Sequence, residues 1–256
     1  MSIKYKISVL TGIGKLESYD KFIDRYYKNI QEQTMFDDIE FVMAYVEWTD
    51  KFEKFKKLPN VKLVQDTKKN GPYGGWNLCL EHSTSDLVTN WNIDDYRFPN
   101  NCELKYRVLL ENKDIDFVYS YCTDSHDVDE TFENFDWSYD RKVFMLPDEF
   151  HRYVLQCCMG GPDPVWRKSL HDEVGYFNGD DFPSIGDWEM WIRFALNGSK
   201  FKLIPEVLCL FFGHDDQVSN MEQKTKNEQY QKLFIKYQNE IPKTETKRFD
   251  IINLAQ

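Results

Sequence analysis

The 256-residue sequence contains no apolar run of about 18 residues or more, so it offers no segment that would cross a membrane as a helix. Its N-terminus also lacks the charged, apolar and small-residue sections of a secretory signal. Integral membrane and secreted proteins are therefore disfavoured. We expect a soluble, cytoplasmic protein with no transmembrane segment, and leave open a peripheral association with a membrane.

The cysteines are not arranged in metal-binding pairs. None of the six cysteines forms a CxxC motif, and most lie in apolar surroundings. Zinc sites and disulfides are therefore disfavoured, and structural thiols in a reducing compartment are expected. The adjacent Cys157 and Cys158 fit this interpretation least well.

Positive charge is in deficit, because 32 Lys and Arg residues face 43 Asp and Glu residues, giving a net charge of −11. Such a chain is not built to coat the phosphates of nucleic acid, and no nucleic-acid partner is expected. A phosphorylated small molecule would need a cation to mediate its binding. Aromatic residues make up 16% of the chain and could stack on sugars or bases, although we expect most of them in the core.

Strand and helix signals alternate in the first part of the chain. Buried strands are predicted at 6–10, 39–46 and 61–64, and apolar residues recur at helical spacing from about 18 to 33. A short helical piece at 51–57 precedes the third strand. This β-α-β-α-β order predicts an α/β fold, in which helices flank a mainly parallel central sheet and a ligand binds at the carboxyl ends of the strands.

The remaining sequence continues this pattern less regularly. Helices are predicted near 76–83, 101–111 and 187–196, and strands at 87–91, 116–121, 201–204 and 207–212. The acidic and aromatic stretch 124–148 has no clear period and is a candidate acceptor-facing loop or lid. The tail 224–241 has an apolar stripe that predicts an amphipathic helix docked on the domain. We expect one large domain, 1–220, and a C-terminal helical extension, 221–256.

The predicted strand at 87–91 ends in clustered oxygen ligands. Asn92, Asp94 and Asp95 follow it directly. Mg²⁺ and Mn²⁺ prefer carboxylate, amide and water oxygens, and they usually keep positions open for the phosphates of a substrate. Asp94 is therefore the first candidate for a metal ligand. Asp and Asn also gather at ordinary strand-to-turn junctions, so this segment needs support from elsewhere in the sequence.

That support comes from the order of four segments, which are ISVLTGIG with the later Thr49 and Asp50, NGPYGGWNLCLEHSTSDLVTNWNIDD, GGPDPVWRKSLHDEVGYFN with GDWEMWIR, and GHDDQVSN. Together they resemble the family 2 glycosyltransferases with the Rossmann-like GT-A fold, which transfer a sugar from a nucleotide sugar with inversion. The similarity spans roughly residues 4 to 220, on the scale of one large domain.

The resemblance implies a UDP-, GDP- or dTDP-sugar donor, a glycan, glycoconjugate or protein-linked sugar acceptor, and Mn²⁺ or Mg²⁺ as cofactor. Asp94 aligns with the direct metal ligand of the family's DxD signature. Asn92 occupies the first position of that signature, and it falls with Asp95 where the family contacts the ribose, the phosphates or the metal's waters. His214 matches a late histidine implied to contact the metal or the diphosphate, although a lone loop histidine is often a surface or packing residue.

Asp187 begins the helix predicted at 187–196 and lies off its inward stripe. By resemblance it is the base that takes the acceptor hydroxyl's proton, and the helix N-terminus favours its ionised form. The alternative is that Asp187 only caps the helix. Trp166 could equally be a core residue. Four positions are implied on the acceptor side: Asp163, Trp166, Trp188 and Glu189. Glu189 is expected to be a supporting residue that holds either the acceptor or a neighbouring Arg.

The nucleotide pocket departs from the family pattern. Where the family carries an Asp pair before Gly-Ser, this chain reads Tyr-Val-Glu-Trp at 45–48. Glu47 could supply the carboxylate, and Thr11 is the other residue expected to line the pocket. The departure keeps open a non-catalytic glycan-binding module descended from a transferase, although the retained Asp94 and Asp187 oppose it. A sugar-nucleotide nucleotidyltransferase is a further alternative, for which TGIGKLES only thinly imitates the expected Gly-rich phosphate loop.

Overall fold

The computed structural model describes residues 5–68, 71–137, 141–142, 154–155, 157–158, 160–214 and 223–240. Three predicted features fall wholly or partly outside these residues. They are the candidate loop beyond residue 137, the last part of the His and Ser segment at 215–220, and the tail beyond residue 240.

Four strands form a parallel half-sheet. β1 (Ile7–Ile13) lies between β2 (Ile39–Tyr45) and β4 (Leu87–Asn90), and β3 (Val61–Gln65) pairs with the other side of β2. The last residues of β1, β2 and β3 are register partners, so these three carboxyl ends meet at one edge of the sheet. The predicted alternating start of the chain is confirmed.

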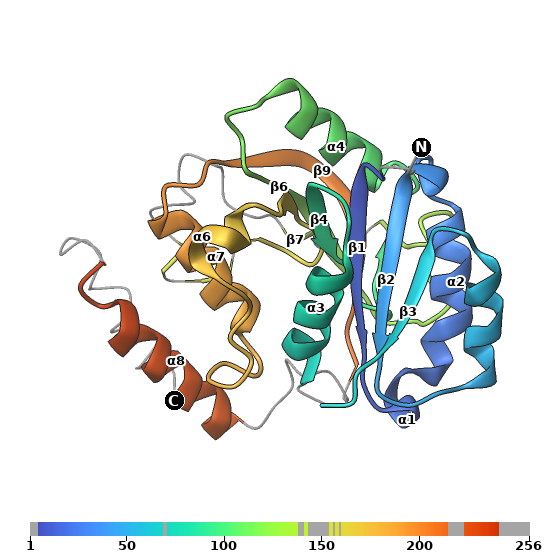
Figure 1. The fold of residues 1–256 in the computed structure, drawn as a ribbon, viewed down its shortest axis with the longest axis horizontal. Coiled ribbons are helices and arrows are strands. Elements are labelled where there is room, and N and C mark those ends of the chain that lie inside the picture. Colours follow the sequence, from blue (N-terminus) through green and yellow to red (C-terminus); the bar gives the residue numbers. More distant parts are fainter. Residues whose placement is uncertain are drawn as a thin grey trace.

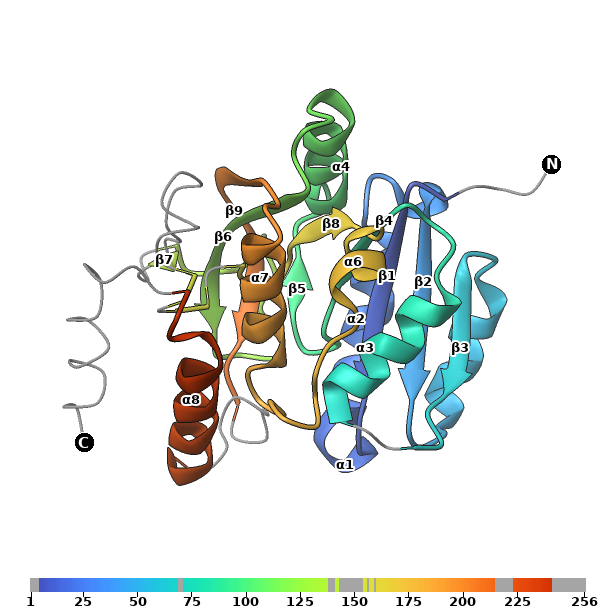
Figure 2. The same cartoon turned by 60° about the vertical axis from the view of Figure 1, so that its left-hand side comes forward.

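Side chains on these strands alternate between two faces, and a helix covers each face. Leu10 belongs to the apolar cluster that includes α3 (Gly71–His82), whereas Val9 packs in the cluster that includes α2 (Ile23–Gln31). Figures 1 and 2 show α2 and α3 on opposite sides of the sheet. The helix predicted at 18–33 is interrupted, because a short α1 (Leu16–Tyr19) and a 3₁₀ turn precede α2.

The second half of the sheet mixes strand directions. β8 (Val165–Arg167) joins the halves and runs antiparallel to both β4 and β6 (Phe117–Ser125). β9 (Phe201–Phe212) is parallel to β6 and antiparallel to β5 (Tyr96–Arg97), while β7 (Arg141–Lys142) pairs with β6. The strand order is β3-β2-β1-β4-β8-β6-β9-β5, with β7 off this path. The predicted α/β fold class is confirmed.

One strand assignment needs correction. The strands predicted at 201–204 and 207–212 are a single strand, β9, whose pairing is irregular in the middle. Ile204 is the partner of Ser120, and Val207 is already the partner of Tyr121. Pro205, which has no N–H to donate, occupies the irregular step and explains the break in the sequence signal.

Four further α-helices lie in the described chain: α4 (Asn101–Glu111), α6 (Leu170–Val174), α7 (Gly186–Leu196) and α8 (Gln223–Tyr237). The described chain also contains the 3₁₀ helices η2 (Phe36–Asp38) and η3 (Asp50–Lys57), and η3 is the helical piece predicted at 51–57. α8 lies outside α7, at the end of the molecule opposite β3 (Figures 1 and 2). Leu233 and Tyr237 bury its apolar stripe in the cluster that contains α7. None of the helices in the described part of the chain is long and apolar enough to span a bilayer. The division at residue 220 stays a prediction.

The six thiols are free, and four of them are buried. Those four are Cys79, Cys102, Cys122 and Cys209, as expected for structural thiols in apolar surroundings. Cys157 and Cys158 are exposed, which agrees with their poorer fit to that interpretation.

Candidate functional site

A cavity of about 180 Å³ opens at the carboxyl ends of β1 and β4. Asn92 and Asp94 reach it from the loop after β4, and Asp187 reaches it from the first turn of α7. The first turns of α3 contribute Tyr73 and Trp76. The fold therefore brings three predicted residues, from two distant segments of the sequence, to one cavity at the edge of the sheet where a ligand was expected.

Asp94 and His214 meet beside this cavity. His214 Nε2 lies 3.0 Å from Asp94 Oδ2, and their side chains are only 6% and 10% exposed. The imidazole packs against the rings of Phe22 and Phe212, and Arg25 donates to the backbone carbonyl of Asp94. Packing and backbone contacts thus hold this carboxylate–imidazole pair in place from several elements.

The Asp94–His214 pair supplies part of the donor set of a metal site. Among the described residues, no group of three or more His, Cys, Asp or Glu side chains is placed to hold a metal ion. The Asp94 carboxylate and the His214 imidazole are nevertheless a suitable pair of donors, and an oxygen-preferring cation commonly completes its shell with water and substrate phosphates. The residues fit a cation that is bound only partly by the protein.

Asp95 anchors the loop that carries Asp94. Its Oδ1 accepts from the N–H of Phe212 at 3.3 Å, and its Oδ2 accepts from Asn92 Nδ2 at 3.2 Å. Burial raises the pKa of Asp95 well above its usual value, and the adjacent charge of Asp94 acts in the same direction. Asp95 is only 1% exposed, and its carboxyl accepts hydrogen bonds that join the loop to β9 and orient the Asn92 amide.

Asp187 accepts a hydrogen bond across the cavity from another helix. Its Oδ1 lies 2.9 Å from the hydroxyl of Tyr73, and its Oδ2 lies 4.0 Å from Cys158 Sγ. Burial raises the pKa of Asp187, while the Tyr73 hydroxyl and the N–H of Trp188 act in the opposite direction by favouring the carboxylate. This is the environment of a carboxylate whose proton affinity is increased but which can still ionise.

The indole N–H of Trp76 is a further feature of the cavity. Trp76 is 4% exposed, and its Nε1 has no hydrogen-bond partner among the described residues. A buried donor without a partner is costly, so a ligand oxygen in the cavity would relieve that cost.

A second cavity, of about 340 Å³, adjoins the first and shares Gly12, Tyr19 and Pro72 with it. The exposed Glu47 lines this cavity and accepts from the backbone N–H of Leu16 at 3.1 Å. Glu47 is thus in the predicted region. The two adjoining cavities together are the candidate site.

Glycines allow α3 to approach β1 between these cavities. A Cβ on Gly75 would lie 3.3 Å from Gly12 Cα, and a Cβ on Gly12 would lie 3.3 Å from the carbonyl oxygen of Pro72. Both contacts are with backbone atoms, which cannot rotate away.

Thr11 was expected in the nucleotide pocket but is placed in the core. Its side chain is fully buried, and its hydroxyl lies 2.6 Å from the hydroxyl of Tyr26. Asp66, which the sequence analysis missed, lines the larger cavity directly after β3. The available signal was an Asp at the end of a predicted parallel strand, the same signal that singled out Asp94.

No protein-family model matches the chain. Among curated proteins, the uncharacterized glycosyltransferase YwdF of Bacillus subtilis is 24% identical over 152 residues, which cover 59% of this chain. The match covers 53% of that protein, so the chain spans about half the length of this relative.

Solved structures with the same architecture include TarS of S. aureus in complex with UDP-GlcNAc, at a TM-score of 0.63 and 15% identity, covering 84% of this chain and 61% of that one. The mannosyltransferase PcManGT of Pyrobaculum calidifontis, in complex with GDP-Man and Mn²⁺, has a TM-score of 0.56 and 18% identity, covering 82% and 57%. The chain has a glycosyltransferase fold.

Within this glycosyltransferase fold, the four residues predicted on the acceptor side occupy core positions. Asp163 is fully buried and pairs with Lys105, and Trp166 is fully buried between β4 and β6. Trp188 donates to the carbonyl of Val154 at 2.5 Å. These groups are engaged in packing and internal pairing, and their acceptor-side role stays a prediction.

Glu189, the fourth of these residues, links α7 to α8. Its carboxylate is fully buried and accepts from Lys236 Nζ and the Tyr237 hydroxyl, each at 2.6 Å, and from Arg193. The ionic and hydrogen-bonding contacts lower the pKa of Glu189 despite its burial. Glu189 therefore fixes the helix that carries Asp187.

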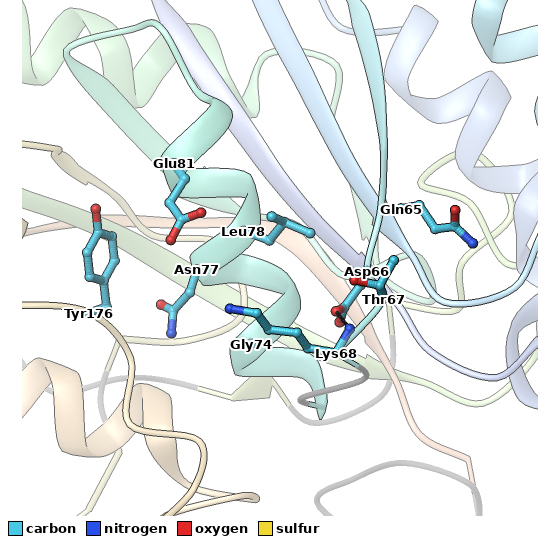
Figure 3. A pocket seen from close by; sticks show the side chains of 9 residues that line it. All are labelled: Gln65, Asp66, Thr67, Lys68, Gly74, Asn77, Leu78, Glu81 and Tyr176. Atoms are coloured by element: carbon cyan, nitrogen blue, oxygen red, sulfur yellow. Dashed lines mark hydrogen bonds between the residues drawn. The ribbon is translucent and has the colours of Figure 1, made fainter.

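A third cavity, of about 270 Å³, lies on the outer side of α3. Figure 3 shows Glu81, Asn77 and Tyr176 along one side of this helix, with Lys68 extending toward Asn77. Asn77 is engaged with the backbone of Phe177 through both of its amide atoms. Asp66 lines both this cavity and the cavity of about 340 Å³ that also contains Glu47.

Proposed function

We propose that the protein is a metal-dependent, inverting glycosyltransferase, which moves a sugar from a nucleoside-diphosphate sugar to a hydroxyl of a glycan, glycoconjugate or other acceptor. The observation that carries the proposal is the convergence of Asp94, paired with His214, and Asp187 on one cavity at the carboxyl ends of the strands. The fold shared with TarS and PcManGT, and the named relative YwdF, support the same reading.

Asp187 is the proposed base. Inversion needs one group to take the acceptor proton while the anomeric carbon is attacked from the face opposite the departing diphosphate. A base is most effective when its pKa is near the working pH, and burial shifts the pKa of Asp187 in that direction. The hydrogen bond from Tyr73 keeps the carboxylate oriented for this step.

Asp94 and His214 would hold a divalent cation, with Asn92 close by on the cavity wall. Such a cation, when bound, supplies positive charge that offsets the charge developing on the nucleoside diphosphate. The chain's own residues then keep the donor in place. The Trp76 N–H is available to an oxygen of the bound donor.

We assign the nucleoside to the larger cavity, where Glu47 and Asp66 offer carboxylates. The diphosphate and sugar would then extend past Gly12 into the smaller cavity. TarS with UDP-GlcNAc and PcManGT with GDP-Man support a nucleotide-sugar donor of this kind. We assign recognition of the base to residues 45–48, where the sequence departs from the family pattern, and to Asp66, for which no role was predicted from the sequence.

The test is release of nucleoside diphosphate from UDP-, GDP- and dTDP-sugars with Mn²⁺ or Mg²⁺ and a panel of saccharide acceptors. We would compare the wild type with Asp94→Ala and Asp187→Asn, using the exposed Asp172→Asn as a matched control. Metal-dependent turnover of one donor class, lost in both variants and kept in the control, is expected.

The alternatives give different results in the same experiment. Donor binding that depends on Asp94, without turnover by any acceptor, would favour the non-catalytic glycan-binding module. Formation of a nucleotide sugar from a sugar phosphate and a nucleoside triphosphate would favour the nucleotidyltransferase. Absence of any nucleotide binding would contradict the proposal.

A further inference from the structure

Tyr73 is the one hydroxyl that contacts Asp187 among the described residues. It lies in the first turn of α3, lines the cavity shared by Asp94 and Asp187, and is only 5% exposed. No role was predicted for Tyr73, which stands in the Gly-rich segment GPYGGW before the helix predicted near 76–83. The contact joins α3, which borders both cavities, to α7, which carries the proposed base.

The ring of Tyr73 is closely confined. It is in edge-to-face contact with Trp76 at 5.2 Å and stacks on Phe177 at 6.0 Å between ring centroids. A Cβ on Gly186, immediately before Asp187, would lie 2.9 Å from the ring. The ring therefore fills the space left by that glycine, and its hydroxyl is aimed at the neighbouring carboxylate.

The direction of the hydrogen bond follows from the surroundings. Burial and the neighbouring Asp187 raise the pKa of Tyr73 well above its usual value, so the phenol stays protonated and donates. Cys158 faces the other carboxylate oxygen, and the charge of Asp187 also acts on Tyr230 of α8. Tyr73 is thus the donor that fixes Oδ1. The one side-chain contact that Oδ2 receives among the described residues is the weak thiol contact from Cys158 Sγ at 4.0 Å, and Oδ2 is the oxygen left to an acceptor hydroxyl.

We propose that Tyr73 is a positioning residue for Asp187, holding the carboxylate ionised and turned so that Oδ2 takes the acceptor's proton. This inference rests on the proposed function. It implies that α3 both borders the donor site and orients the proposed base. It also predicts that the hydroxyl of Tyr73, rather than its ring, affects catalysis.

The test uses Tyr73→Phe, which keeps the ring and removes only the hydroxyl. Tyr5→Phe is the matched control, because Tyr5 precedes the amino end of β1, opposite the end that borders the cavity, and its hydroxyl donates to the carbonyl of Pro59 at 3.4 Å. The carboxyl of Asp187 is titrated by NMR in protein labelled with ¹³C-aspartate, and Asp187→Asn identifies its resonance. The pH dependence of kcat/KM is measured on the same proteins.

We expect the titration midpoint of Asp187 to rise by about one pH unit in Tyr73→Phe, since a hydrogen bond to the charged form is lost. The acidic limb of the kcat/KM profile should move by the same amount. The plateau of kcat should fall by on the order of tenfold because the carboxylate is less well oriented, with the donor KM unchanged. Tyr5→Phe should match the wild type in every measurement.

A midpoint that stays at the wild-type pH would overturn the inference, as would a pH profile identical to that of the control. The NMR titration needs no turnover, so the positioning role of Tyr73 and the proposed function can fail separately. If the titration moves but no donor is turned over by the wild type, the pairing stands and the proposed function fails. If the wild type is active and Tyr73→Phe changes neither measurement, only the positioning role fails.

Discussion

Replacing Asp187 by Asn should separate activity from stability. The substitution keeps the shape of the side chain and an oxygen that can accept from Tyr73, but it removes the group proposed to take the acceptor's proton. A general base contributes about 10²- to 10⁴-fold to rate. We therefore expect kcat to fall by that factor, which corresponds to about 3–5 kcal/mol in the activation barrier, with donor binding retained.

Stability should change in the opposite sense. The pKa of Asp187 is raised in the folded protein, chiefly by burial, so the ionised carboxyl costs stability at any pH above the usual aspartate value of 3.8. Neutral Asn removes that cost. At neutral pH the variant should unfold at the same temperature as the wild type or at a higher one, and the difference should vanish as the pH falls below 3.8.

Two assays check this reasoning on the same samples: nucleoside diphosphate release, and thermal unfolding between acidic and neutral pH. The exposed Asp172→Asn should change neither result. A variant that keeps most of its activity would refute the assignment of the base. A large fall in melting temperature at neutral pH would show instead that Asp187 is chiefly a structural cap.

Three further results are expected. Lys105→Met should lower the free energy of unfolding, measured by chemical denaturation, by about 3–5 kcal/mol, because it leaves Asp163 buried without its cation. A loss below about 1 kcal/mol would contradict the description of Lys105 and Asp163 as a buried ion pair. Glu47→Gln should weaken nucleotide binding, measured by calorimetry, while kcat at saturating donor is retained; loss of kcat alone would count against its place in the nucleoside cavity. His171 accepts from the Trp166 indole N–H, and burial lowers its pKa from 6.5 to about 4. The stability that the neutral His171 contributes is complete above pH 6.5 and is lost as the pH falls toward 4, by about 3 kcal/mol in all. His171→Gln should therefore flatten the free energy of unfolding, plotted against pH, between pH 6.5 and 4. An unchanged plot would refute the link between His171 protonation and stability.

The parallel half of the sheet was predictable because its signals are local. Each strand is a short apolar run, and each is followed by a helix or turn that the sequence marks clearly. A parallel strand order then places every strand's carboxyl end at the same edge, so an Asp at the end of one strand can be located before any contact is known. Asp94 was found in this way, and Asp66 would have been found by applying the same rule to β3.

The acceptor-side residues could not be placed by such a rule. β8 enters the sheet between β4 and β6 and runs against both, and this insertion buries Trp166. Asp163 is matched by Lys105, which is 58 residues away in the chain. A polar residue in a segment of mixed composition gives no local sign of such a partner. A resemblance between segments does not distinguish a residue that faces a ligand from one that faces the core.

The arrangement of the two cavities bears on the altered nucleotide pocket. Residues 45–48 depart from the family pattern, and Glu47 belongs to the larger cavity. Asp94 and Asp187 line only the smaller one, and Gly12, Tyr19 and Pro72 are common to both. A change in base recognition can therefore leave the proposed reaction centre intact. Loss of the proposed activity would instead be expected to release the constraint on the smaller cavity. The Tyr73 hydroxyl, the Asp94–His214 pair and the Trp76 N–H, which has no partner among the residues that the structure describes, are all still in place there. This separation favours an altered donor preference over a non-catalytic module.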